Sequence, residues 1–184
     1  MKTRRRLLLL PLAWLLTACA SLPAPPPRPE RGSIGSFSLE GRIAARQGER
    51  PYHAGISWRH GAQEDAILLT GPLGQGIAEL TRDHQGARLV TAEGRTYQAA
   101  DWAALAEEVL GLTLPLKELP HWLAARVDAR SRDEQGRPRR ALADGWIIDY
   151  LSYESEQPDA LPTLMEMQRD DIDLRLKIDQ WQIP

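Results

Sequence analysis

The single cysteine of this chain closes a short stretch whose residue types favour one kind of chemistry. Cys19 ends the tetrapeptide Leu16-Thr17-Ala18-Cys19, and a small residue flanks it on each side. This pattern is typical of a lipobox, in which the cysteine sulfur receives a diacylglycerol and the new amino terminus is acylated after cleavage. A lone cysteine in an exported protein has no disulfide partner within its own chain. We therefore predict that Cys19 carries a lipid anchor.

The residues before Cys19 have the organisation of a secretory signal. Lys2 and three arginines precede an apolar stretch at 7–16, which is much shorter than the roughly 20 residues of a spanning helix. The alternative is an ordinary signal peptide, with Cys19 left unmodified. We expect a signal peptide at 1–18, the lipidated cysteine with a proline-rich tether at 19–36, and one domain at 37–184.

Removal of the signal changes the charge of the chain. The whole chain has 23 Lys and Arg against 25 Asp and Glu, and four basic but no acidic residues precede Cys19. The mature chain therefore carries 19 basic and 25 acidic side chains, a net charge of −6. This balance argues against a nucleic-acid partner, which requires a basic face, and against membrane attachment by a polybasic patch.

Other residue types that could perform chemistry lack the necessary spacing. The four histidines, His53, His60, His84 and His121, form no metal-binding pair, and we interpret them as solvated surface residues. The segment 71–76 is rich in glycine but lacks the Lys-Ser/Thr of a phosphate loop. No serine lies in a nucleophile elbow. We therefore predict no enzyme activity, no metal and no cofactor.

The glycine-rich segment has one unusual residue at the expected tip of its turn. Leu73 lies between Pro72 and Gly74, where polar residues are usual. From the residues alone, the simpler interpretation is that Leu73 folds back onto the core. The alternative is an exposed apolar wedge for a membrane or a partner.

Alternating polar and apolar residues dominate the rest of the chain. Ile172, Leu174, Leu176 and Ile178 alternate with charged residues, which predicts a strand with one buried face. We expect similar strands at 37–43, 52–58, 66–70, 76–82, 87–92, 95–99 and 146–150. Hairpin-length gaps separate them, which favours an antiparallel sheet.

A small helical block interrupts the strands. Asp101 is a suitable N-cap and Gly111 a suitable C-terminal residue for a first helix. A second helix is expected to start near Pro115, and Pro120 should keep it short, kinked or split. Residues 126–140 are highly charged, and we expect a mobile surface loop there. The predicted fold is mainly β with an α lid: an unclosed antiparallel barrel of about 10–11 strands covered by a small helical block.

Several motifs in consistent order resemble the LolB family of outer-membrane lipoprotein receptors. The main one is Ile67-Leu68-Leu69-Thr70-Gly71-Pro72-Leu73-Gly74. The others are Gly41-Arg42, Trp58, Gly94-x-x-Tyr97, Gly111-x-x-Leu114-Pro115-Leu116, Leu119-x-x-Trp122-Leu123, Gly145-Trp146-x-x-x-Tyr150 and Leu174-x-Leu176-x-Ile178-x-x-Trp181. The resemblance covers nearly all of 37–181. It departs from the family before the first strand, where the proline-rich residues predict that an extra N-terminal helix is missing or very short.

The resemblance implies a function in lipoprotein transport. Proteins of this family accept mature lipoproteins from the periplasmic carrier LolA and release them into the inner leaflet of the outer membrane. It also implies an exposed loop leucine at Leu73, with Pro72 and Gly74 beside it, which reverses the interpretation from the residues alone. We expect a monomeric, lipid-anchored protein that faces the periplasm. The rival is a lipid-anchored periplasmic adaptor or scaffold without a ligand cavity.

An acyl-chain receptor needs an apolar interior and a cover. Candidates for the cavity are Leu39, Ile56, Trp58, Leu69, Leu80, Ile148, Tyr150, Leu176 and Ile178. Candidates for the lid are Trp102, Leu105, Leu119, Trp122 and Leu123. For each single residue, packing in a dry core is an equal alternative to contact with a ligand.

Overall fold

Eleven strands and two α-helices make up the part of the chain that the computed structural model describes, residues 29–110 and 116–184. The strands are β1 Phe37–Gln47, β2 Arg50–His60, β3 Asp65–Thr70, β4 Gly76–Asp83, β5 Gly86–Thr91, β6 Thr96–Ala99, β7 Ala129–Arg132, β8 Pro138–Ala143, β9 Trp146–Tyr153, β10 Pro162–Arg169 and β11 Ile172–Gln182. The helices are α1 Trp102–Leu110 and α2 Leu119–Leu123, and a short 3-10 helix, η1, spans Arg31–Ser33. Cys19 and Gly111 lie outside the described residues.

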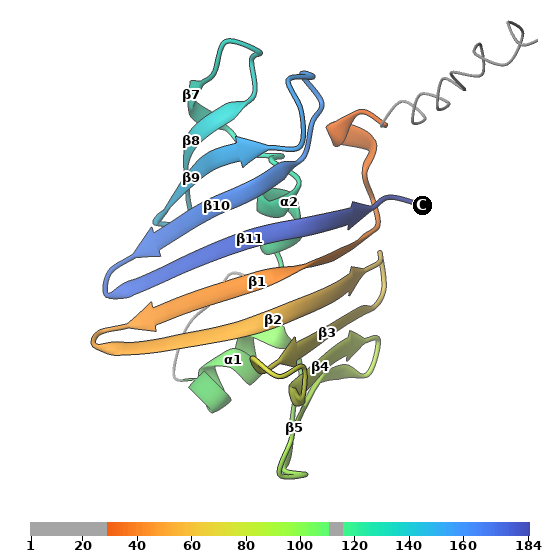
Figure 1. Cartoon of the computed structure of the whole chain (residues 1–184). Coiled ribbons are helices and arrows are strands. Elements are labelled where there is room, and N and C mark those ends of the chain that lie inside the picture. The colour runs from red at the N-terminus through yellow and green to blue at the C-terminus, as the bar shows by residue number, and fades with distance from the viewer. Residues whose placement is uncertain (1–28, 111–115) are drawn as a thin grey trace, which may run out of the picture.

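All eleven strands belong to one antiparallel sheet. Their order is β6-β5-β4-β3-β2-β1-β11-β10-β9-β8-β7, so consecutive strands pair within each half, and the pairing of β1 with β11 joins the two halves. The sheet curves, and α1 and α2 lie behind it in Figure 1. The two edge strands, β6 and β7, do not pair with each other. The predicted unclosed antiparallel barrel with a helical block is confirmed.

The predicted alternation decides which side chains face the interior. Leu39, Trp58 and Trp181 form a cross-strand row over β2, β1 and β11, and each is at least nine-tenths buried. Gly41 continues the inner face of β1 at a register shift against β11. A Cβ at this position would stand 2.2 Å from the carbonyl oxygen of Lys177, so only glycine permits this approach of the two strands.

The helical block agrees with its sequence signals except at the start of the second helix. That helix begins at Leu119 and not near Pro115, which lies outside the described residues. The Asp101 carboxylate accepts a hydrogen bond from the Ala104 amide at 2.9 Å, as expected of an N-cap. The second helix has only five residues and contains Pro120 in its first turn, where a missing N–H costs nothing. Before the first strand, the described residues hold η1, which has three residues.

Two expectations for the C-terminal half were wrong. Residues 126–140 were expected to form a mobile loop, but they contain β7 and part of β8. The residues of β10 were assigned no strand, although Met165 and Met167 alternate there and face the core. The high charge at 126–140 was misleading because one of its charges is buried and paired.

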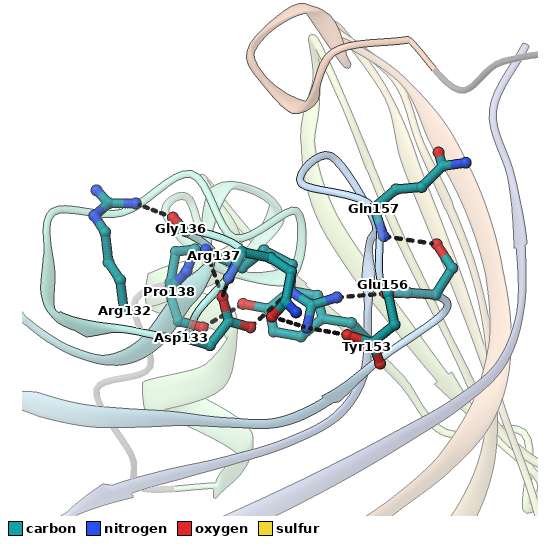
Figure 2. Close-up of polar contacts among 10 residues, drawn as sticks. Arg132, Asp133, Gly136, Arg137, Pro138, Tyr153, Glu156 and Gln157 are labelled. Atoms are coloured by element: carbon teal, nitrogen blue, oxygen red, sulfur yellow. Dashed lines mark hydrogen bonds and ion pairs between the residues drawn. The ribbon is translucent and has the colours of Figure 1, made fainter.

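That buried charge is Arg137, which fastens the β7–β8 hairpin to the β9–β10 loop (Figure 2). Its side chain is only 8% exposed, and its Nε donates a hydrogen bond to the Asp133 carboxylate at 2.7 Å. The guanidinium also donates to the carbonyl oxygen of Ser155 and lies 4.5 Å from the ring centre of Tyr153. Burial would raise the pKa of Asp133, but the hydrogen bonds and charge of Arg137 lower it. The charged hairpin is thereby held in the sheet.

Candidate functional site

A tight turn between β3 and β4 presents Leu73 to solvent. The Gly71 amide donates to the Gln75 carbonyl at 2.8 Å, and the Gly74 amide donates to the Gly71 carbonyl at 2.9 Å. Gly74 has a φ of +81°, a conformation that glycine adopts without strain. The Leu73 side chain is 93% exposed. The interpretation that Leu73 folds back onto the core is therefore wrong, and Pro72 and Gly74 beside it are exposed as well.

The predicted cavity and lid residues come together on the inner face of the sheet. All fourteen belong to one hydrophobic cluster, in which Leu69, Leu80 and Leu119 are partly buried and the others are buried. Nine come from strands, two from α1 and three from α2. The structure thus gathers the whole set in one apolar layer.

Aromatic side chains join the helices to the sheet. Trp102 of α1 packs on Trp58 of β2 with ring centres 5.8 Å apart, and Trp122 of α2 packs on Trp146 of β9 at 6.4 Å. The Tyr150 hydroxyl donates to the carbonyl oxygen of Trp122 at 2.8 Å, and burial raises the pKa of this tyrosine. The lid side chains thus pack against the inner face of the sheet.

Several inner-face residues were missing from the predicted set. Two are tryptophans, Trp146 and Trp181, which are 1% and 6% exposed; Met165 and Met167 also belong to this cluster. Trp146 continues the alternation of Ile148 and Tyr150, so its signal was present in the sequence. The indole N–H groups of Trp102 and Trp146 are buried and have no hydrogen-bond partner within the described residues.

A buried carboxylate at the start of β3 holds the other end of this layer together. Asp65, 5% exposed, accepts hydrogen bonds from Trp58 Nε1 at 2.9 Å and from Arg82 Nε at 2.7 Å. The His60 ring lies 2.7 Å away and packs on Phe37. Burial alone would raise the pKa of Asp65, but the hydrogen bonds from His60, Trp58 and Arg82 outweigh it and lower this pKa. The interpretation of His60 as a solvated surface residue was therefore wrong.

The described residues contain no group of three or more side chains arranged to hold a metal ion. No helix among them is long and apolar enough to span a membrane. The distinctive features of the described chain are therefore the apolar inner face, its helical cover and the exposed leucine.

Comparison with known proteins decides the family. The family profile described as "Outer membrane lipoprotein LolB" matches residues 35–181. The chain belongs to the LolB family. It is 41% identical to the outer-membrane lipoprotein LolB of Dechloromonas aromatica (strain RCB) over 97% of each chain. It is 37% identical to the LolB of Azoarcus sp. (strain BH72), over 92% of this chain and 90% of that protein.

Structural comparison supports the fold independently of sequence. A DUF1329 family protein from Desulfovibrio piger ATCC 29098 superposes with a TM-score of 0.50 at 8% identity, covering 83% of this chain and 87% of its own. At such low sequence identity, the superposition shows only that the two proteins share a fold. The shared name of the LolB relatives confirms the predicted class, an outer-membrane lipoprotein.

Proposed function

We propose that this LolB-family protein receives mature lipoproteins from the periplasmic carrier LolA and inserts them into the inner leaflet of the outer membrane. Their acyl chains bind on the inner face of the sheet, and one copy of the chain is sufficient. The observation that carries this proposal is the pairing of a covered apolar face with Leu73, an apolar side chain that is 93% exposed at a fixed turn.

The inner face can admit a ligand if its cover moves. The cover consists of helices of nine and five residues, whereas the sheet is a continuous ladder of eleven strands. Short elements with few hydrogen bonds open at lower free-energy cost than the ladder they cover. Acyl chains then replace the side chains of Trp102 and Trp122 against the same strands. The unclosed edges of the sheet allow this expansion without breaking strand pairs.

The driving force for transfer is hydrophobic. Each methylene group exposed to water costs about 0.8 kcal/mol, so a carrier does not release acyl chains into the periplasm. A receptor with an equal or better apolar site accepts them directly, and the bilayer offers a better site still. Transfer from carrier to receptor to membrane therefore runs down a gradient of affinity.

Two buried hydrogen-bond donors can bind the carbonyl oxygens of the acyl groups. The unpaired indole N–H groups of Trp102 and Trp146 lie where each helix meets the sheet. A buried donor without a partner costs about 1–3 kcal/mol. Ester and amide carbonyl oxygens of a lipidated cysteine can accept these hydrogen bonds and recover that cost.

A fluorescent fatty acid tests the apolar site. We expect micromolar or tighter binding to the wild-type protein. Leu176→Trp, which fills the inner face, should weaken binding at least fivefold, because added volume leaves less space for the chain. The matched control is Leu151→Trp, at a side chain 51% exposed on β9, which should bind normally. Absence of binding by the wild-type protein would favour the adaptor without a cavity.

The lipid anchor is expected to act only as a tether. We propose that Cys19 and the proline-rich segment 19–36 attach the domain 37–184 to the membrane. Cys19→Ala removes the acceptor sulfur, so the protein should appear in the soluble fraction and still take lipoproteins from LolA at the wild-type level. Fractionation and a transfer assay with purified carrier measure both effects. Loss of acceptance in the soluble variant would show that the anchor takes part in transfer.

A further inference from the structure

A groove on the outer face of the sheet lies beside the Leu73 turn. This open groove has a volume of about 570 Å³, and Arg42, His53, Arg175 and Lys177 line it together with Leu164 and Pro72. Ile43 and Ala54, which lie between these residues along β1 and β2, also border it. The basic side chains belong to the face opposite the apolar layer, because they alternate along β1 and β11 with Ile43 and Leu176 of the inner cluster. The groove is therefore separate from the proposed acyl-chain site.

The strand register explains how the groove forms. One row across five strands consists of Leu164, Lys177, Arg42, Gly55 and Thr70, in the order β10, β11, β1, β2 and β3. Small residues form its floor: Gly55 has no side chain, and a Cβ there would lie 2.4 Å from the Thr70 hydroxyl oxygen.

The next row of the register completes the groove. Ala44, also small, stands between His53 on β2 and Arg175 on β11. Long cationic side chains thus stand beside a floor of small residues.

The charge of the groove differs from that of the whole chain. Every charged residue that lines it is basic, although the mature chain has a net charge of −6. Arg42 and Lys177 share one carboxylate, Asp179, at 3.0 and 3.5 Å, and Arg175 pairs with Glu166 at 3.1 Å. Three permanent cations therefore face two carboxylates, and none of those carboxylates lines the groove.

The position of the groove indicates what it meets. Pro72 forms part of its wall, and the next residue is the exposed Leu73. Arg42 lies two strands from Thr70, roughly 10 Å at the usual spacing of strands. When Leu73 enters a leaflet, Arg42 and Lys177 are therefore close to the phosphates of the surrounding lipids. Guanidinium and ammonium groups are the preferred partners of phosphate oxygens.

We propose that this groove binds the phosphate-bearing headgroup of a membrane phospholipid while Leu73 is inserted. The proposal rests on the membrane step of the proposed function but not on acyl-chain binding. In this proposal the basic side chains help to orient the protein on the membrane. Leu73 inserts into the apolar part of the leaflet, and the groove binds a headgroup beside it. An acidic surface of the carrier is the other possible occupant. The continuity of the groove with the Leu73 turn favours the membrane.

Vesicle binding by the mature chain with Cys19→Ala tests this proposal without the anchor. The vesicles are phosphatidylethanolamine and phosphatidylglycerol in a 3:1 ratio. Each basic residue near an anionic surface contributes about a factor of five to binding. Arg42→Gln with Lys177→Gln should therefore reduce partition at least tenfold. The matched control, Arg88→Gln with Arg130→Gln, removes the same charge from exposed positions on β5 and β7 and should change partition less than threefold.

Two further measurements identify the occupant. Short-chain phosphatidylglycerol below its micelle concentration should shift the amide resonances of Ala44 and Gly55, and equal shifts with inorganic phosphate would overturn the assignment to a lipid. Normal vesicle binding by the groove variant, or equal losses in both pairs of variants, would also overturn it. Loss of LolA binding with normal vesicle binding would assign the groove to the carrier.

The outcomes separate this proposal from the proposed function. The groove variant should bind the fluorescent fatty acid like the wild type, because its changes lie on the opposite face of the sheet. If fatty acid binding is absent from every variant while the groove effects remain, the proposed function fails and the headgroup site stands. An unchanged melting temperature for Arg42→Gln with Lys177→Gln excludes unfolding as the cause of lost partition. If that variant is unfolded, Lys177→Gln alone should reduce partition about fivefold.

Discussion

Leu73→Glu is expected to reduce delivery of lipoproteins to vesicles at least tenfold without disturbing the fold. The side chain is 93% exposed and its turn is held by backbone hydrogen bonds, so the substitution removes almost no packing. An exposed position of this kind changes the free energy of unfolding by no more than about 0.5 kcal/mol. An ionised side chain in the apolar part of a bilayer costs about 3 kcal/mol on insertion scales, a factor of roughly 100. Insertion of the turn should therefore fail.

The measurement is transfer of a labelled lipoprotein from purified LolA to liposomes through the receptor. Leu151→Glu is the matched control, because it places the same charge on an exposed leucine of β9, on a hairpin distant in the sheet order. We expect it to deliver normally. Acceptance from the carrier should be retained by both variants. Normal delivery by Leu73→Glu would contradict the role of this turn in the membrane.

The fold was predictable where one face of a strand is apolar and the other is charged. The row Leu174, Leu176 and Ile178 alternates with charges and becomes the C-terminal strand, β11. Asp101 likewise caps the first helix as expected. Such local patterns suffice for an antiparallel sheet because all consecutive strands except β6 and β7 pair with each other. The pairing of β1 with β11 joins residues far apart in the chain, and no local sequence pattern marks it.

The parts that sequence did not predict depend on contacts between distant residues. Arg137 looked like one charge among many at 126–140, but its buried pairing with Asp133 and Ser155 keeps this hairpin in the sheet. Asp65 gave no signal at all, because its partners Trp58 and Arg82 come from two other strands.

The two candidate sites show the same limit. The inner-face residues were found by their periodicity, whereas the outer groove depends on the register that brings basic residues beside Ala44 and Gly55. Register across five strands is not visible in a single stretch of sequence. The exposure of Leu73 was also hidden from local reasoning: only its likeness to the family loop favoured the exposed alternative, and the internal hydrogen bonds of the turn explain it.

Asp65→Ala should be the most destabilising single substitution of a polar residue in the described chain. The carboxylate is buried and accepts hydrogen bonds from Trp58 and Arg82, so its removal leaves an indole N–H and a partly buried guanidinium without their acceptor. Breaking a buried charged pair costs about 3–5 kcal/mol. For a domain of this size we expect the melting temperature to fall by roughly 10 °C. Trp58 packs on Trp102, so the contact between the sheet and α1 should loosen first.

The pH dependence of stability separates the charge of Asp65 from its shape. Because the folded state lowers this pKa, the carboxylate stabilises the fold fully above its unfolded pKa of about 3.9, and the contribution is lost as the pH falls through the lower folded value. The difference in the free energy of unfolding between wild type and Asp65→Ala should thus shrink below about pH 4. Denaturant titrations at several pH values measure it. Asp149→Ala is the control, since its partner Arg140 is 60% exposed and such surface pairs contribute at most about 1 kcal/mol. Equal stabilities of the two variants would mean that the buried carboxylate does not hold β3 to its neighbours.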